Sequence, residues 1–198
     1  ALAVDPHLLL LDEPMAGPDY KVRVELPHEL RALQRRIGIT AVYVTHDREE
    51  ALTLADRIAV IDAGRIVQIG PPEEIFHRPE SAFVAGFMGA DNALDLMHTR
   101  EGTLAAAVAG TPAAERLRAH FRSDAAHLAT QASGHAPDAL VLAGVVAQSV
   151  YVGHGYRYRV RTEGAEVWVQ APERVAEGTT ATVVVPRAAL LLFPGHNP

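Results

Sequence analysis

The chain has 198 residues, 48% of them hydrophobic, a formal net charge of −6 at pH 7 and no cysteine. This length suits one large or two small globular domains, and the lack of cysteine excludes disulfides and thiol chemistry within this sequence. The acidic balance, with charges of both signs interspersed, argues against a partner held by a basic patch, such as nucleic acid or an anionic membrane surface.

The first predicted element is a short apolar strand that ends in two carboxylates. Leu8 to Leu11 are four consecutive leucines, followed by Asp12 and Glu13. A run this short and apolar indicates a fully buried strand of a parallel sheet, and ligands bind at the carboxyl ends of such strands. One carboxylate of the pair can hold Mg²⁺ while its neighbour orients or deprotonates a water. An isolated Asp-Glu-Pro fits equally well as the cap of a strand before a turn.

A helix and a second strand are predicted next. Apolar residues recur at spacings of three and four between Val22 and Ile37, which indicates one face of a helix. We expect a bend or break in this helix near Leu26, because the ring of Pro27 clashes with the carbonyl four residues earlier. Residues 39–45 are β-branched and strand-like, and His46 follows at their carboxyl end. There His46 is either a donor to a γ-phosphate or an ordinary polar residue in a turn.

Shorter elements complete the first part of the chain. Asp47 and Glu50 have the spacing of a capping box, which predicts a helix through about Ala55. Residues 57–61 and 65–69 alternate and predict a hairpin, and short helices are expected near 73–77 and 81–88. The turn-rich segment 89–92 then marks the predicted domain boundary, giving domains of residues 1–88 and 89–198.

These segments resemble a known family. Leu8 to Pro14 resembles the Walker B segment of ABC transporter ATPases, and Val44 to Ala51 resembles their switch-histidine region. The similarity continues to Pro79 and is typical of importer ATPase subunits that serve polyamines, iron, phosphonates or sugars. It implies that residues 1–88 are part of an α/β P-loop nucleotide-binding domain of the ABC type, with ATP and Mg²⁺ as cofactors of the complete protein.

The resemblance also implies roles for single residues. Asp12 would help to hold Mg²⁺, Glu13 would polarise the attacking water, and His46 would contact the γ-phosphate. Asp19 would be the D-loop aspartate, which communicates with the opposite subunit of a dimer. The usual Ser-Ala-Leu-Asp of that loop reads Ala16-Gly-Pro-Asp19 here, so a hydroxyl is lost and a proline is added.

Three family motifs are absent from this sequence: the Gly-x-x-x-x-Gly-Lys-Ser/Thr phosphate loop (Walker A), the Q-loop and the Leu-Ser-Gly-Gly-Gln signature. Without a backbone nest and a lysine for the phosphates, we expect that the chain alone neither binds nor hydrolyses ATP well. A truncated gene product, a degenerate paralogue and an expressed fragment all fit this pattern.

Residues 89–198 predict a β-rich domain. Short β-rich runs between Leu140 and Phe193, separated by glycine-containing turns, predict a small antiparallel barrel. Residues 103–109 are also strand-like, residues 116–122 fit a strand or a helix, and residues 130–138 read as a loop. The region resembles the transport-associated OB (TOBE) domain of the same importers, which implies an OB-like regulatory role.

The run from Tyr156 to Arg161 alternates tyrosine or valine with arginine. The alternation places aromatic and aliphatic side chains on one face of a strand and arginines on the other. Basic residues beside aromatics on an OB barrel can bind single-stranded nucleic acid, but a half-buried strand with a solvated basic face is favoured by the acidic net charge. Trp168, on the next run, is expected in the core or at its edge.

The leading hypothesis is the ATP-binding subunit of an ABC importer, coupling ATP hydrolysis to solute uptake in the complete protein. Its partners would be membrane permease subunits and a second copy in a homodimer. Its location would be cytoplasmic, peripheral on the inner face of the membrane. The alternative is a non-enzymatic module in which the OB-like domain dimerises or senses a small anion. Removal of part of an α/β domain would expose apolar surface, so we also expect self-association.

Overall fold

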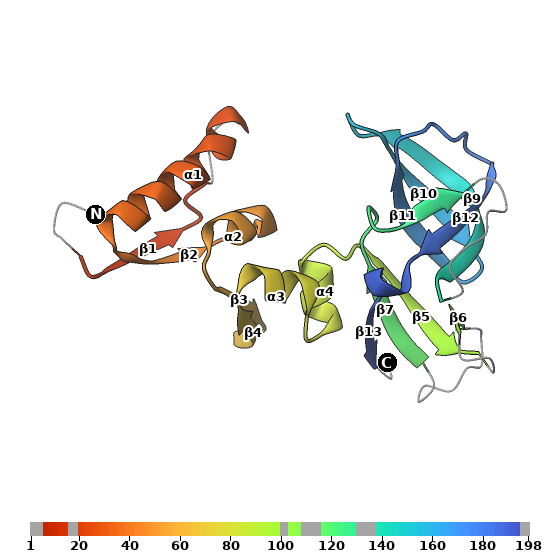
Figure 1. Cartoon of the computed structure of the whole chain (residues 1–198), viewed down its shortest axis with the longest axis horizontal. Helices are drawn as coiled ribbons and strands as arrows, with labels where there is room; N and C mark the ends of the chain where they lie inside the picture. The colour runs from red at the N-terminus through yellow and green to blue at the C-terminus, as the bar shows by residue number, and fades with distance from the viewer. Residues whose placement is uncertain (1–5, 16–19, 100–102, 108–115, 130–137, 195–198) are drawn as a thin grey trace. The chain divides into compact units, whose positions relative to one another are not determined.

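The computed structural model describes residues 6–15, 20–99, 103–107, 116–129 and 138–194 (Figure 1). The chain folds as two compact units, residues 1–78 and residues 79–198. They are called the first unit and the second unit below. The division falls ten residues before the predicted boundary, and the functional boundary after residue 88 stays a prediction.

The first unit mixes helices and strands, with one parallel and one antiparallel strand pair. β1 and β2 pair in parallel, and Asp12 at the end of β1 lies opposite Val44 at the end of β2. β3 and β4 form the predicted hairpin, whose turn residues Ala63 and Gly64 have φ values of 46° and 76°, as a type I′ turn requires. The elements are β1 (Leu8–Asp12), α1 (Tyr20–Ile37), β2 (Thr40–Val44), α2 (Arg48–Leu54), β3 (Ile58–Asp62), β4 (Arg65–Gly70) and α3 (Pro72–His77).

The prediction that the leucine strand is fully buried is wrong. No residue of β1 or β2 is buried, and the face that carries Leu8, Leu10, Val42 and Val44 is exposed, with Leu10 at 69%. The described residues contribute only these two strands to the sheet. The leucine run has the composition of a strand covered on both faces, but the described part of the chain leaves one of them open.

The expected break near Leu26 is wrong, whereas a bend there stays a prediction. α1 runs without interruption over 18 residues, and Pro27 lies buried inside it. Proline removes a single backbone donor, so the other backbone groups can keep the helix continuous on both sides.

The described residues of the second unit form one short helix, two antiparallel sheets and a 3₁₀ turn at Arg187–Ala189. One sheet has the strand order β11-β10-β9-β12-β8 and the other β13-β7-β5-β6, and the first is strongly curled (Figure 1). The elements are α4 (Ala82–Phe87), β5 (Asn92–His98), β6 (Leu104–Ala106), β7 (Arg116–Phe121), β8 (His127–Ala129), β9 (Leu140–Tyr151), β10 (Tyr156–Thr162), β11 (Ala165–Ala171), β12 (Thr180–Val185) and β13 (Leu191–Pro194).

The core of this unit lies between its two sheets. Leu96 and Phe121 from one sheet and Leu140, Tyr158 and Val169 from the other are fully buried in a single apolar cluster. The alternation in β10 is confirmed, because Tyr158 and Val160 are buried in the core while Arg157, Arg159 and Arg161 are not. A mostly β unit with a curled sheet fits the expected OB-like domain.

Several local features of the second unit were left open or missed by the sequence prediction, and the structure shows them. Residues 116–121 form a strand rather than a helix. β5 begins at Asn92, inside the segment that the sequence predicts as a turn, and β8 was not predicted. The predicted loop 130–138 lies almost entirely outside the described residues.

His120 is a buried titratable residue of the second unit. Its side chain on β7 is 8% exposed, its ring meets Phe193 edge to face at 5.9 Å, and its Nδ1 lies 3.4 Å from the carbonyl oxygen of Ala90. Burial lowers the pKa of His120; the contact with Ala90 opposes this effect, and the charge of Arg118 adds to it. We therefore expect the neutral imidazole in the folded protein near pH 7.

Candidate functional site

The parallel pairing of β1 and β2 brings the two predicted catalytic side chains together. Both strands end at the same edge; Glu13 follows β1 directly, and Thr45 separates His46 from the end of β2. His46 Nδ1 lies 2.9 Å from Glu13 Oε1, and the side chains of His46 and Glu13 are 81% and 48% exposed. An ionised carboxylate can only accept hydrogen bonds, so Nδ1 carries the proton in this pair. The geometry therefore gives an accessible carboxylate beside an oriented imidazole.

Glu13 has a strained backbone. Its φ is 43°, in the left-handed region that residues other than glycine rarely adopt, and its N–H donates to the carbonyl oxygen of Val44 at 2.8 Å. Such outliers persist only where the surrounding structure determines them, and they cluster at functional sites. Here the hydrogen bond to Val44 extends the pairing beyond the end of β1 and turns the chain at the carboxylate.

Asp12 ends β1 immediately before Glu13 and is exposed. Its hard oxygen donors fit Mg²⁺, which proteins usually hold through one or two carboxylates together with phosphate oxygens. The described ranges contain no cluster of three or more His, Cys, Asp or Glu side chains able to hold a metal ion by themselves. Asp19, the predicted D-loop residue, lies outside the described residues.

Three side chains around His46 form a network of hydrogen bonds. Asp47 caps α2, because its Oδ1 accepts from the N–H groups of Glu49 at 2.8 Å and Glu50 at 3.4 Å. The predicted cap is confirmed, but Glu50 makes no bond back to the N–H of Asp47. Instead, Thr45 Oγ1 accepts from that N–H at 3.0 Å and donates to Glu50 Oε2 at 2.7 Å. The sequence prediction overlooked Thr45, although a threonine two residues before Asp47 is a signal for such a turn.

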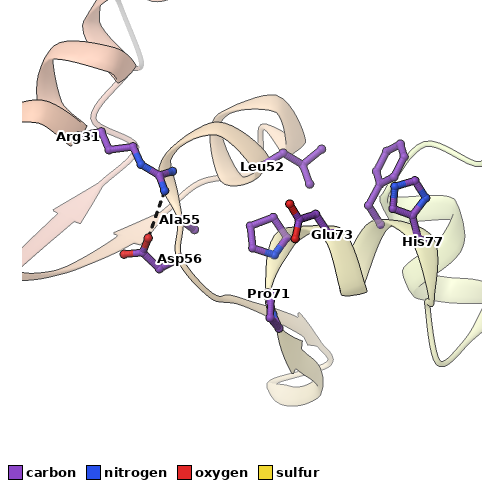
Figure 2. A pocket seen from close by; sticks show the side chains of 9 residues that line it. Arg31, Leu52, Ala55, Asp56, Pro71, Glu73 and His77 are labelled. Carbon is purple, nitrogen blue, oxygen red and sulfur yellow. Dashed lines mark hydrogen bonds and ion pairs between the residues drawn. The ribbon is translucent and has the colours of Figure 1, made fainter.

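A pocket of the first unit lies between α2 and α3, at Arg31 of α1 (Figure 2). Arg31 Nη2 lies 3.2 Å from Asp56 Oδ1 at its rim, and Arg31 Nη1 donates to the carbonyl oxygen of Thr53 at 2.6 Å. Glu73 and His77 line it as well, but none of the predicted site residues does. The pocket is therefore separate from the carboxylate and histidine.

The arginines of β10 are engaged within the second unit. Arg157 lies 2.5 Å from a carboxylate oxygen of Asp91, and Arg159 and Arg161 lie 3.5 and 3.1 Å from Glu166. The guanidinium carbons of Arg157 and Arg159 lie 4.7 and 5.8 Å from the centre of the Trp168 ring. Partners of opposite charge offset this basic face, which supports an ordinary half-buried strand over a surface for nucleic acid.

The second unit carries the sequence of a known domain. A family model described as "TOBE domain" matches residues 114–193, which covers most of the strands described above. No helix in the described residues has the length and apolar character needed to cross a membrane.

The whole chain is similar to import ATP-binding proteins. It is 39% identical to the spermidine/putrescine import ATP-binding protein PotA 1 of Pseudomonas aeruginosa, over 97% of this chain and 56% of that protein. It is 42% identical to the spermidine/putrescine import ATP-binding protein PotA of Acidothermus cellulolyticus, over 100% of this chain and 54% of that protein. It is 40% identical to the sulfate/thiosulfate import ATP-binding protein CysA 2 of Chromobacterium violaceum, over 99% of this chain and 57% of that protein.

The chain thus spans about half the length of the relatives it matches. Their shared description agrees with the importer resemblance of the Walker B and switch-histidine segments and favours that role over a non-enzymatic module. These matches support a likeness of the chain to the C-terminal part of ABC importer ATP-binding proteins, with a TOBE domain over residues 114–193.

Proposed function

We propose that this chain supplies the water-activating part of an importer ATPase site, with Glu13 as the base, His46 as the γ-phosphate contact and Asp12 as a carboxylate for Mg²⁺. The proposal rests mainly on the 2.9 Å contact between Glu13 and His46 at the shared edge of two parallel strands. Phosphoryl transfer depends on positioning and on stabilisation of charge, and these side chains offer both.

The chemistry of the pair follows from its hydrogen bonds. Glu13 can take a proton from a water that attacks a phosphorus atom, and His46 Nδ1 orients this carboxylate. When His46 holds Glu13 through Nδ1 and also donates to a phosphate through Nε2, both nitrogens carry protons and the ring is an imidazolium. Mg²⁺, when bound, would neutralise charge on the phosphates. A phosphate-binding loop is missing from this sequence, so the complete site requires residues that this chain does not contain.

In the complete protein, hydrolysis would drive solute uptake through membrane permease subunits, in a homodimer on the cytoplasmic face of the membrane. The printed solutes of the relatives include cationic spermidine and putrescine as well as anionic sulfate. Relatives of such different solutes match this chain at similar identity, so we assign no solute. We also propose residues 1–88 as the nucleotide-binding part and 89–198 as the regulatory part.

The test is MgATP hydrolysis in a chimera in which this chain replaces the matching segment of PotA 1 from Pseudomonas aeruginosa. Glu13→Gln and His46→Ala should each lower kcat about 100-fold or more, as loss of a general base or a charge-stabilising donor does. Glu49→Gln, an exposed change on α2, is the matched control and should leave kcat unchanged.

The isolated 198-residue chain should show no hydrolysis above background. A rate in the isolated chain that Glu13→Gln abolishes would contradict the requirement for a phosphate-binding loop. Full activity of the chimera with Glu13→Gln would contradict the role of Glu13 itself.

A further inference from the structure

Packing does not hold the imidazole of His46 in place. The side chain is 81% exposed, and its recorded polar contact in the described residues is Glu13. The rotamers open to an exposed side chain depend on the φ and ψ of its backbone, so the backbone also decides whether the side chain can reach its hydrogen-bond partner. The orientation of His46 therefore depends on what fixes the backbone on its two sides.

The residues on both sides of His46 are tied to one another. The N–H of Asp47 donates to Thr45 Oγ1 at 3.0 Å, so one hydroxyl bridges the chain directly across His46. Thr45 Oγ1 in turn donates to Glu50 Oε2 at 2.7 Å, which anchors the bridge to α2. Because Thr45 Oγ1 acts as acceptor and donor at once, the two bonds strengthen one another, and the charged acceptor makes the second one strong.

We propose that Thr45 and Glu50 are positioning residues that hold the imidazole of His46 against Glu13. The relevance of this inference to catalysis rests on the proposed function, whereas the orientation of His46 by Thr45 and Glu50 does not. Glu50 has no contact with His46 or Glu13 in the described structure and acts through the hydroxyl of Thr45. The carboxylate of Glu50 thereby determines whether Nδ1 of His46 faces Glu13.

The test is the tautomer of His46 in the purified 198-residue chain, measured by ¹H–¹⁵N long-range NMR correlation at pH 8 without nucleotide. The His46 signals are assigned by their absence in His46→Gln. In the unaltered chain we expect the Nδ1–H form to dominate, because Glu13 accepts from Nδ1. Thr45→Val removes both bonds and should shift the ring to the Nε2–H form that dominates in a free histidine side chain.

Two conservative variants separate positioning from a general loss of structure. Thr45→Ser keeps the hydroxyl, and Glu50→Gln keeps an acceptor oxygen, so both should retain the Nδ1–H form. Glu50→Ala should lose it, while Glu49→Ala on the same helix should not. If Thr45→Val unfolds the first unit, as seen from the amides of β3 and β4, the Glu50 variants decide the question.

A dominant Nδ1–H form in folded Thr45→Val or Glu50→Ala would overturn the inference, and so would its absence from the unaltered chain. The NMR measurement uses no nucleotide, so it fails or succeeds independently of the hydrolysis assay. Loss of the Nδ1–H form in the variants, with hydrolysis by the chimera unaffected by Glu13→Gln, would leave the positioning intact and remove the proposed ATPase role.

Discussion

The two units of the chain are stabilised in different ways. The second unit encloses an apolar cluster between two sheets, with side chains such as Leu96 and Val169 fully buried. The first unit exposes one face of its parallel strand pair, including Leu10 and Val44, and its candidate site lies at the edge of that pair. Backbone pairing and capping bonds can thus place a carboxylate beside a histidine on a sheet that buries little. The buried apolar cluster thus lies in the second unit, whereas the proposed catalytic residues lie in the first unit.

The largest expected effect is loss of core packing in the second unit. Leu96→Ala should lower the free energy of unfolding by about 2–5 kcal/mol, since it leaves a cavity in a fully buried cluster. Urea unfolding followed by the fluorescence of Trp168, the only tryptophan, measures this change. Leu10→Ala is the matched control, and an equal shift of the Trp168 transition in that variant would refute the contrast between the units.

A smaller loss is expected at the edge of β11. Asn92 is 1% exposed, and its side chain bonds both the carbonyl and the N–H of Trp168, at 2.8 and 2.5 Å. Asn92→Ala leaves these backbone groups without their partner and should cost about 1–3 kcal/mol in the same urea experiment. Thr103→Ala, which removes an exposed hydroxyl contact, should change stability by no more than about 0.5 kcal/mol. Equal losses of unfolding free energy in the two variants would show that the burial of Asn92 adds nothing to the stability of the second unit.

A pH-dependent loss of stability is expected from His120 in the second unit. The pKa of His120 is lowered by burial, so protonation favours the unfolded state. Its contribution to stability is complete above about pH 6.5, the usual value in unfolded chains, and falls as pH drops toward the lowered pKa. His120→Gln cannot titrate, so unfolding free energy measured between pH 7 and 5 should fall less steeply in this variant. Equal slopes would exclude His120 as the source.

The smallest effect on stability is expected at the candidate site. Glu13 and His46 form an exposed hydrogen-bonded pair, and even exposed ion pairs contribute only about 0–1 kcal/mol. Glu13→Gln and His46→Ala should therefore leave the thermal midpoint of the first unit, followed by amide NMR signals of β3 and β4, nearly unchanged. A loss of several kcal/mol would show that the pair is structural, which would weaken the proposed ATPase role.

Local rules in the sequence predict much of the first unit. Consecutive leucines before Asp12, the cap at Asp47 and the turn at Gly64 each depend on neighbouring residues, and the structure confirms the strand, the helix and the hairpin. Burial of the leucine strand was predicted wrongly, because burial depends on which elements cover a face rather than on composition. The roles of Asp12, Asp19, Glu13 and His46 stay predictions until hydrolysis is measured.

The sequence by itself determined which side chains end each strand, where helices begin and which face of β10 is apolar, because these properties depend on residues within a few positions of one another. Only the tertiary structure decided that β1 and β2 pair in the register that joins Glu13 to His46. It also decided that Asn92 bonds to Trp168, 76 residues away, and that residues 116–121 form a strand. Such contacts depend on how distant segments meet, and local sequence patterns do not encode that meeting.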